Sequence, residues 1–228
     1  MPRPKLPDKN YEWTPELAYV VGLLVTDGNL SKNGRCISIR SSDMQLLLTF
    51  TKCLGLSREK IVQTKNDGWA KRPCYRVQFS NVQLYRWLTK IGLFPNKTYT
   101  IGEIQVPDQY FKDFLRGHLD GDGSIWTYKD SWNSFKNPKY VYTRLWARFY
   151  SASVVHIRWI QQQLIRLLAI KGHTWERKTR KPYQTTNMWE LKFAKKESIK
   201  LLSWIYYRPD VPCLKRKRKI AEKFISKR

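Results

Sequence analysis

Two short stretches of the sequence place an aspartate after a run of apolar and small residues. The first, LAYVVGLLVTDGNL, contains Asp27, and the second, FLRGHLDGDGSIW, contains Asp122. When Gly22 is aligned with Gly117, the two aspartates fall in register and a glycine follows each. Carboxylates that share divalent cations can support the hydrolysis of phosphate esters, because the cations activate water and stabilise the leaving group. This chemistry requires a fold that brings the two carboxylates together.

The second stretch contains a further carboxylate, Asp120. Counting from Asp120 as the first position of an EF-hand loop puts Ile125 where the loop requires glycine and Ser131 where it requires glutamate, which argues against a calcium loop. In the first stretch Val25 stands at the position of Asp120. We therefore expect Asp120 to be a hydrogen-bonding residue at a helix end or an interface, and not a metal ligand.

Both stretches are predicted to form short helices that end at Asp-Gly. Thr14 followed by Pro15 is typical of a helix start, and Pro107 followed by Asp108 marks the start of the second helix.

Small residues recur four positions apart in both predicted helices, at Gly22 and Thr26 and at Gly117 and Gly121. Residues at this spacing share one helix face. We expect the two helices to pack closely along these faces and to bring Asp27 and its counterpart together at their C-terminal ends.

The elements that follow each helix repeat as well. Alternating and helical periodicities predict two strands, a helix, two strands and a helix after each motif helix. The better-defined predicted strands are RCISIRSSD, Ile61–Asn66 and Tyr75–Ser80, then RLWARFYSAS, His173–Lys178 and Met188–Ala194. The predicted helices run from about Asp43 to Leu54 and through Leu84–Ile91, Ile157–Leu168 and Ile199–Tyr206. The sequence thus predicts an α+β fold of two pseudo-symmetric αββαββα halves with antiparallel sheets.

The repeat also predicts the domain boundaries. We expect an N-terminal half at 1–94, a linker at 95–107 and a C-terminal half at 108–228 that ends in a basic tail. The second half has additional residues, TYKDSWNSFKNPKYV, which we expect to form a long hairpin loop. The tail, LKRKRKIAEKFISKR, is expected to be either a solvated helix or a disordered basic arm.

Composition narrows the classes of partner. The 43 Lys and Arg residues against 18 Asp and Glu give a net charge of +25, which indicates a polyanion such as nucleic acid. No apolar run approaches the roughly 20 residues that cross a bilayer, and the start of the chain lacks a signal-peptide pattern. We expect a soluble intracellular protein with no membrane partner. The dispersed cysteines and histidines argue against a zinc site or a disulfide framework, so any metal must be held mainly by carboxylates.

The predicted strands place apolar residues on one sheet face and Arg, Gln, Ser and aromatic residues on the other. Such a face is either simply solvated or suited to the major groove, where Arg and Gln contact base edges and Lys contacts phosphates. The candidate DNA-binding residues are Arg35, Ser38, Arg40, Lys65, Arg76, Gln78, Arg144, Trp146, Arg148, Tyr150, Lys178 and Lys192.

The two stretches resemble the signature motifs of LAGLIDADG homing endonucleases, in the single-chain form with two motifs. The residues that match are Gly22, Leu23, Asp27 and Gly28, and Leu115, Gly117, Leu119, Asp120, Asp122 and Gly123. The resemblance covers nearly the whole chain and implies two motif helices packed at the interface of a DNA-binding saddle. Val25 departs from the pattern, because the family often has an acidic residue there.

The resemblance implies that Asp27 and Asp122 bind Mg²⁺ and each serve one DNA strand, with Mn²⁺ tolerated. It implies that the backbone carbonyls of Thr26 and Gly121 also ligate metal, and that the cut across the minor groove leaves 3′ overhangs.

The resemblance also implies supporting residues around the two metal-binding aspartates. Lys97 and Lys217 would stabilise charge on the phosphate or help to position water, although a basic surface or a phosphate clamp is an equally good interpretation of each lysine. Arg40 and Tyr150 occupy matching strand ends where the family places a polar residue near the scissile phosphate, and Tyr150 is the weaker match.

We therefore expect a monomeric, metal-dependent endonuclease that cuts both strands of a long asymmetric DNA target. The alternative is a protein of the same fold that does not cleave DNA, either an intron RNA maturase or a DNA-binding regulator. Retention of both aspartates favours the nuclease, but a maturase can also keep them. A structural RNA-binding protein would explain the charge but not the two matched motifs.

Overall fold

The computed structural model describes residues 11–64, 73–178 and 187–225, so Lys65 lies outside the described residues. The first half comprises α1 (Pro15–Thr26), β1 (Gly28–Leu30), β2 (Cys36–Ser41), α2 (Met44–Leu54), β3 (Ile61–Thr64), β4 (Cys74–Ser80) and α3 (Val82–Lys90). The second comprises α4 (Asp108–Asp120), β5 (Ser124–Asp130), β6 (Tyr142–Ser151), α5 (Val154–Leu168), β7 (His173–Arg177), β8 (Met188–Phe193), α6 (Lys195–Ile205) and α7 (Lys215–Ile225). The predicted α+β plan of two repeated halves is confirmed, and the described part of the basic tail is the helix α7.

Local signals explain where the helices begin and end. The Thr14 hydroxyl accepts a hydrogen bond from Leu17 N at 3.1 Å, with Pro15 at the first helical position of α1. Asp43 caps α2 in the same way, and α2 ends at Gly55, whose φ of 64° suits a residue without a side chain. In contrast, α4 follows Pro107 without a side-chain cap.

Each half contains one antiparallel sheet, and the two sheets have equivalent strand orders. The orders are β1-β2-β4-β3 and β5-β6-β8-β7. On the inner faces, Ile37, Ile39 and Val77 in the first sheet and Leu145 and Phe149 in the second are almost fully buried. The opposite faces carry the polar and aromatic residues, as the alternation predicts. One face of each sheet therefore forms the core and the other is available to a partner.

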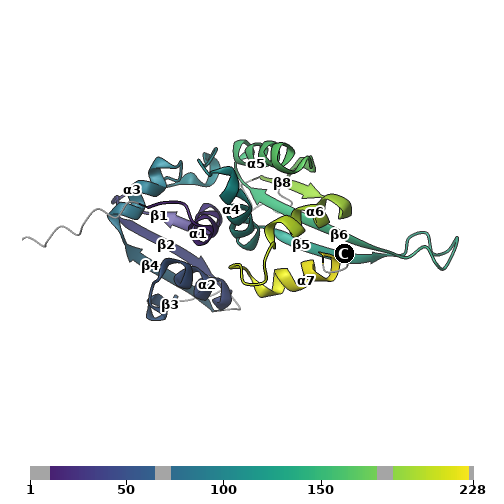
Figure 1. Ribbon diagram of the computed structural model, residues 1–228, viewed down its shortest axis with the longest axis horizontal. Coiled ribbons are helices and arrows are strands. Elements are labelled where there is room, and N and C mark those ends of the chain that lie inside the picture. The colour runs from purple at the N-terminus through teal and green to yellow at the C-terminus, as the bar shows by residue number, and fades with distance from the viewer. Residues whose placement is uncertain (1–10, 65–72, 179–186, 226–228) are drawn as a thin grey trace, which may run out of the picture.

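The two motif helices lie side by side in the middle of the molecule, and the halves extend away from them (Figure 1). The β5–β6 hairpin projects well beyond the second half. The sequence predicts a loop for residues 127–141, but β5 continues to Asp130 and pairs with β6 as far as Tyr142. The prediction was too long at this end because Thr127, Tyr128 and Lys129 continue the alternation of a strand.

No helix of the described residues is both long enough and apolar enough to cross a lipid bilayer.

The crossing of α1 and α4 depends on glycines that allow backbone to touch backbone. A Cβ atom on Gly22 would lie 2.1 Å from the Phe114 carbonyl oxygen, and one on Gly117 would lie 2.1 Å from the Tyr19 carbonyl oxygen. Both distances are far below any non-bonded contact, and the obstructing atoms belong to helix backbones that cannot move aside independently. Neither position can hold a larger residue without separating the helices.

We predict that Gly22→Ala lowers the free energy of unfolding by about 3 kcal/mol or more, because the added methyl group forces the helices apart. Gly102→Ala is the matched control, since a Cβ there would meet only Val155 Cγ1 at 3.7 Å. It should change stability by about 0.5 kcal/mol or less. Denaturant titrations of the two variants give the comparison, and equal losses would contradict this account of the crossing.

Candidate active site and nucleic-acid interface

The two aspartates lie at the C-terminal ends of the crossed helices. Asp27 is the C-terminal cap of α1, and Asp122 follows Gly121, the cap of α4. A Cβ on Gly121 would lie 1.9 Å from Thr26 Oγ1 and 3.0 Å from Asp27 Oδ2. Gly121 at the end of α4 is thus in close contact with Thr26 and Asp27 at the end of α1, at the seam between the halves.

The environment of these aspartates favours their neutral forms. Loss of water around Asp27 and, second, the negative charge of Asp122 raise the pKa of Asp27 to about 6. The side chain of Asp122 is exposed, but partial desolvation at the seam also raises its pKa, against the opposing influence of Lys217 and Lys97. Among the described residues, none donates a hydrogen bond to either carboxylate. The site thus concentrates negative charge that the protein does not fully compensate.

Two buried lysines contact equivalent backbone carbonyls, those of the glycines that follow the two aspartates. Lys97, in the short 3₁₀ helix η2 (Lys97–Tyr99), donates from Nζ to the carbonyl oxygen of Gly28. Lys217 in α7 donates from Nζ to the carbonyl oxygen of Gly123, the counterpart of Gly28, at 2.7 Å. Burial lowers the pKa of each lysine to about 8, and the nearby aspartates oppose this change. Neither lysine belongs to an ordinary basic surface.

Lys217 makes more contacts than its counterpart. Its Nζ also lies 2.6 and 2.8 Å from the carbonyl oxygens of Leu119 and Asp120 and 3.4 Å from that of Gly121, so its three N–H groups are shared among four carbonyl oxygens. These are the carbonyls that a helix C-terminus leaves without partners, so the cation closes the end of α4. The sequence motif gives no sign of this helix-capping contact, because it depends on where α7 packs.

Asp120 is a buried structural residue, as its absence from the first motif suggests. Its Oδ2 accepts hydrogen bonds from Tyr19 Oη of α1 at 2.9 Å and from Leu214 N at 2.7 Å. The second bond fixes the segment that leads into α7. Asp120 therefore orients the helix that carries Lys217.

The donor set fits a hard divalent cation. The described residues contain no group of three or more His, Cys, Asp or Glu side chains that could hold a metal. The available oxygens are the carboxylates of Asp27 and Asp122 and neighbouring backbone carbonyls, the ligand types that Mg²⁺ accepts together with water. The Thr26 hydroxyl is used within its own helix, where it donates to Leu23 O at 3.0 Å. Because the carboxylates repel one another and accept no hydrogen bond from the described residues, a cation would relieve a real electrostatic cost.

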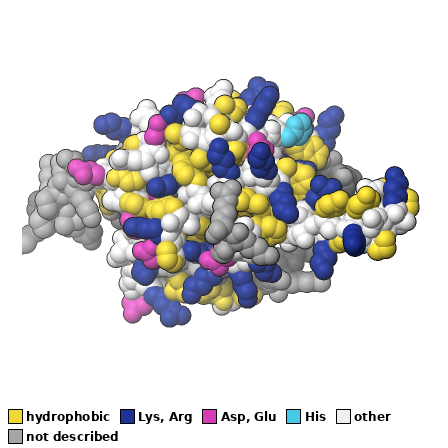
Figure 2. All heavy atoms as spheres, turned by 45° about the vertical axis from the view of Figure 1, so that its right-hand side comes forward, with side chains coloured by type: hydrophobic (Ala, Val, Ile, Leu, Met, Phe, Trp, Pro, Cys, Tyr) yellow, Lys and Arg dark blue, Asp and Glu magenta, His cyan; other side chains and the backbone are white. Residues whose placement is uncertain are grey.

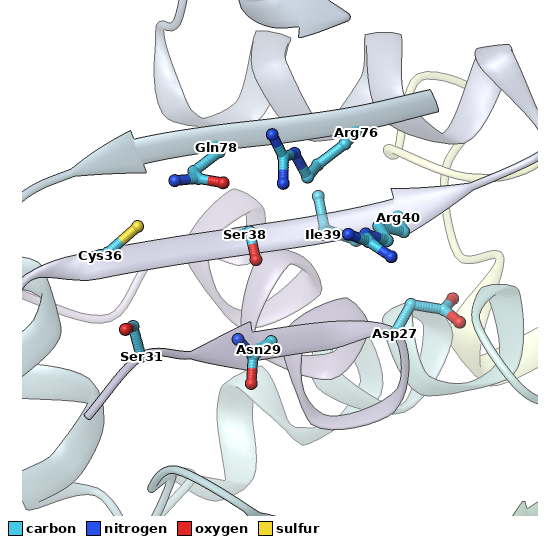
Figure 3. A pocket seen from close by; sticks show the side chains of 9 residues that line it. All are labelled: Asp27, Asn29, Ser31, Cys36, Ser38, Ile39, Arg40, Arg76 and Gln78. Atoms are coloured by element: carbon cyan, nitrogen blue, oxygen red, sulfur yellow. The ribbon is translucent and has the colours of Figure 1, made fainter. Parts of the chain in front are cut away.

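A polar groove leads away from Asp27 across the outer face of the first sheet (Figure 3). Its volume is about 420 Å³, and β1, β2 and β4 supply its walls. Register places Asn29, Ser38 and Gln78 in one row and Arg40 opposite Arg76 in the next. Of the predicted residues, the structure brings Ser38, Arg40, Arg76 and Gln78 into the groove, whereas Arg35 is exposed in the turn before β2.

Asn29 and Ser31 also line this groove and were missed from the sequence. The strand β1 has only three residues, too few for a visible alternation, but Asn29 follows the Asp-Gly of the motif directly. That position is a signal that could have identified it.

The outer face of the second sheet carries the remaining predicted residues. Arg144, Trp146, Arg148 and Tyr150 alternate along β6 on this face, and Lys192 pairs with Arg148 from β8. Lys178 is exposed directly after β7. Tyr150 Oη lies 3.5 Å from Ser124 Oγ and is half-buried, so it differs in environment from the exposed Arg40 that it matches in the repeat.

Lys and Arg side chains are spread over the face seen in Figure 2, where Asp and Glu are few. Hydrophobic side chains also cover much of the projecting arm in this view. On this face, basic charge is therefore not confined to one patch.

Comparison with known proteins was made at the level of sequence and of structure. No protein-family model and no curated protein matches the sequence. The structure resembles the I-LtrWI LAGLIDADG homing endonuclease bound to target DNA, with a TM-score of 0.54 and 14% identity over 92% of this chain and 88% of that one. The chain has the LAGLIDADG homing-endonuclease fold. The I-SmaMI LAGLIDADG homing endonuclease bound to cleaved DNA gives a TM-score of 0.58 and 12% identity over 96% and 89% of the two chains.

The LAGLIDADG fold also occurs outside proteins described as endonucleases. The N-terminal LAGLIDADG domain of WhiA gives a TM-score of 0.52 and 17% identity over 95% of this chain and 90% of that one. The fold alone therefore does not decide between cleavage and binding.

We predict that the contribution of Asp27 to the stability of the metal-free protein falls as pH rises from about 4 to 6. This contribution is the difference between wild type and Asp27→Asn, because the buried His118 and His156, whose pKa values are lowered by burial, change the total stability in the opposite direction. The pKa of Asp27 is about 6 in the folded state and 3.8 when unperturbed, so the folded state binds more protons in this window and loses stability as they leave. Asp27→Asn removes this titration and should raise the free energy of unfolding above pH 6 by about 1–2 kcal/mol. Urea titrations in EDTA across this range test it, with the exposed Asp210→Asn as control. Parallel curves for Asp27→Asn and wild type would refute it.

We predict that Lys217→Met destabilises the fold more than Lys97→Met. The ammonium group of Lys217 lies within hydrogen-bond distance of four carbonyl oxygens. Its removal leaves these carbonyls without a charged donor and should lower the free energy of unfolding by about 2 kcal/mol. Thermal unfolding of both variants at one pH without metal gives the comparison. A smaller loss for Lys217→Met would show that its helix-capping contacts contribute little.

Proposed function

We propose that this protein is a site-specific endonuclease that hydrolyses both strands of a long asymmetric duplex DNA. The observation that carries this proposal is the pair of carboxylates, Asp27 and Asp122, which lie together at the seam of two pseudo-symmetric halves and accept no hydrogen bond from the described residues. Each half presents a sheet face toward a partner, and a net charge of +25 suits a polyanion.

Each sheet would lie along the major groove of one half-site. In the first half, Arg76 and Gln78 can form paired hydrogen bonds with purine edges. Arg40 lines the same groove as Asp27 and would contact the DNA backbone near the cut. Because the two halves differ in sequence, the two half-sites must differ as well. One chain supplies both motifs, so a monomer suffices.

Asp27 and Asp122, with the backbone carbonyls of Thr26 and Gly121, would hold Mg²⁺, and Mn²⁺ is an acceptable substitute. When bound, the cation supplies activation of water and stabilisation of charge on the leaving 3′ oxygen. Each aspartate serves one strand, and cleavage across the minor groove leaves 3′ overhangs as in the family that this fold resembles.

Lys97 and Lys217 stabilise the backbone around the two aspartates. Each ammonium group contacts a carbonyl of the Asp-Gly turn and so fixes the backbone from which the aspartate projects. Their positive charges also lower the pKa of Asp27, which keeps more of it ionised at neutral pH.

We predict that Asp27→Asn and Asp122→Asn each abolish double-strand cleavage and leave the affinity for DNA within about threefold of wild type. The targets are selected from a randomised duplex library with Mg²⁺. Linearisation of a plasmid that carries the selected site measures cleavage, and gel shifts in EDTA measure binding. The exposed Asp210→Asn serves as control and should cut normally. Normal cutting by both site variants would disprove the metal assignment.

The alternative functions give different results in the same experiments. A DNA-binding regulator of this fold would select a duplex target that wild type does not cut with any divalent cation. An intron RNA maturase would stimulate splicing, and this activity would persist in both aspartate variants.

A further inference from the structure

The outer faces of the two sheets differ in chemistry although their strand orders are equivalent. On the first sheet the outer face is polar, and among the described residues no carboxylate forms an ion pair with Arg40 or Arg76. Arg76 Nε is buried without a hydrogen-bond partner, as is Arg148 Nε in the second half, so the difference between the two faces lies in the ion pairs. Within the described part of the chain, the guanidinium groups of Arg40 and Arg76 are therefore not held by a carboxylate.

On the second sheet the corresponding cations already have partners. Arg144 is paired with Asp130 at 2.8 Å, and Arg148 lies 3.5 Å from the buried Glu190. Arg148 also lies 5.2 Å from the centre of the Trp126 ring, and Lys192 Nζ lies 3.9 Å from the centre of the Trp146 ring. These contacts hold the cations against their own face and reduce what they can donate to base edges.

The second face is instead rich in exposed aromatic surface. Among the described residues, seven of the eight exposed aromatic side chains belong to β5, β6, β7 or the β5–β6 loop: Trp126, Tyr128, Trp132, Phe135, Tyr140, Tyr142 and Trp175. Trp126 is 48% exposed and Trp175 45% exposed. On the strands of the first sheet, the exposed large apolar residue is Val62, and it is aliphatic.

Such a surface restricts what can be recognised in a duplex. Base faces are stacked inside the helix, so the rings meet only groove edges. The apolar group that marks a base pair in the major groove is the C5 methyl of thymine. Aromatic rings have few hydrogen-bonding groups for the major-groove edges of base pairs, but their carbon surfaces can bury this methyl group.

Building on duplex DNA as the partner in the proposed function, we infer that the two halves recognise their half-sites by different chemistry. The first half reads base edges by hydrogen bonds from Arg76 and Gln78. The second half selects a thymine-rich half-site by apolar contact with thymine methyl groups, centred on Trp126 and Tyr128. Asp130 and Glu190 contribute by holding Arg144 and Arg148 away from the bases.

Replacement of thymine by uracil tests this inference, because it removes the methyl group and leaves every hydrogen-bonding atom in place. After selection of a bound duplex, all thymines are replaced by uracil in one half-site at a time, and Kd is measured in EDTA. We expect one half-site to lose about fourfold in affinity per buried methyl group and the other to change less than twofold. Trp126→Ser should remove part of the sensitivity. Val62→Ser, at a residue of equal exposure on the first sheet, should leave it unchanged.

The outcomes separate this inference from the proposed function. Uracil sensitivity in neither half-site, or sensitivity that Trp126→Ser leaves intact, would overturn the inference even if the protein cuts DNA. Sensitivity confined to one half-site and reduced only by Trp126→Ser would support it even if the protein binds without cutting. Failure to bind any duplex from the library would overturn both.

Discussion

The backbone contact between α1 and α4 is the constraint on which the rest of the structure depends. Gly22 and Gly117 let each helix touch carbonyl oxygens of the other, so the helices cross closely along these faces and end together. This crossing sets the position of both Asp-Gly turns and hence of both aspartates. It also fixes the relative placement of the two sheets, because the first strand of each sheet begins directly after its motif helix. Close packing thus serves the core and the candidate site at once.

Bringing two carboxylates together has an electrostatic cost, and the protein only partly offsets it. Lys97 and Lys217 are buried beneath the turns and lower the pKa of Asp27, yet desolvation and the charge of Asp122 still raise it to about 6. The lysines are directed at backbone carbonyls and not at the carboxylates. The carboxylate oxygens therefore accept no hydrogen bond from the described residues, an arrangement that suits a divalent cation.

The two halves share the same order and pairing of strands, but they differ in the side chains at equivalent positions. Strand order, motif position and the lysine contact with the Asp-Gly turn repeat, whereas Asp120, the β5–β6 extension and the aromatic outer face occur in the second half alone. Asp120 illustrates the difference: its carboxylate accepts hydrogen bonds from Tyr19 of the other half and from Leu214 before α7, whereas the apolar Val25 at the equivalent position has no group that can accept them. Duplicated halves can diverge on their outer faces, provided that the contacts between the motif helices are kept.

The sequence by itself determined the repeated order of helices and strands, the two motifs and the pairing of Asp27 with Asp122. These features depend on local periodicity, capping residues and glycine spacing, which are written in short stretches of chain. Only the tertiary structure decided that Lys217 closes the C-terminus of α4, that Asn29 joins the groove, and that Glu190 and Asp130 engage the arginines of the second sheet. These features depend on contacts between residues far apart in sequence, and such contacts exist only once the strands have paired and the helices have packed.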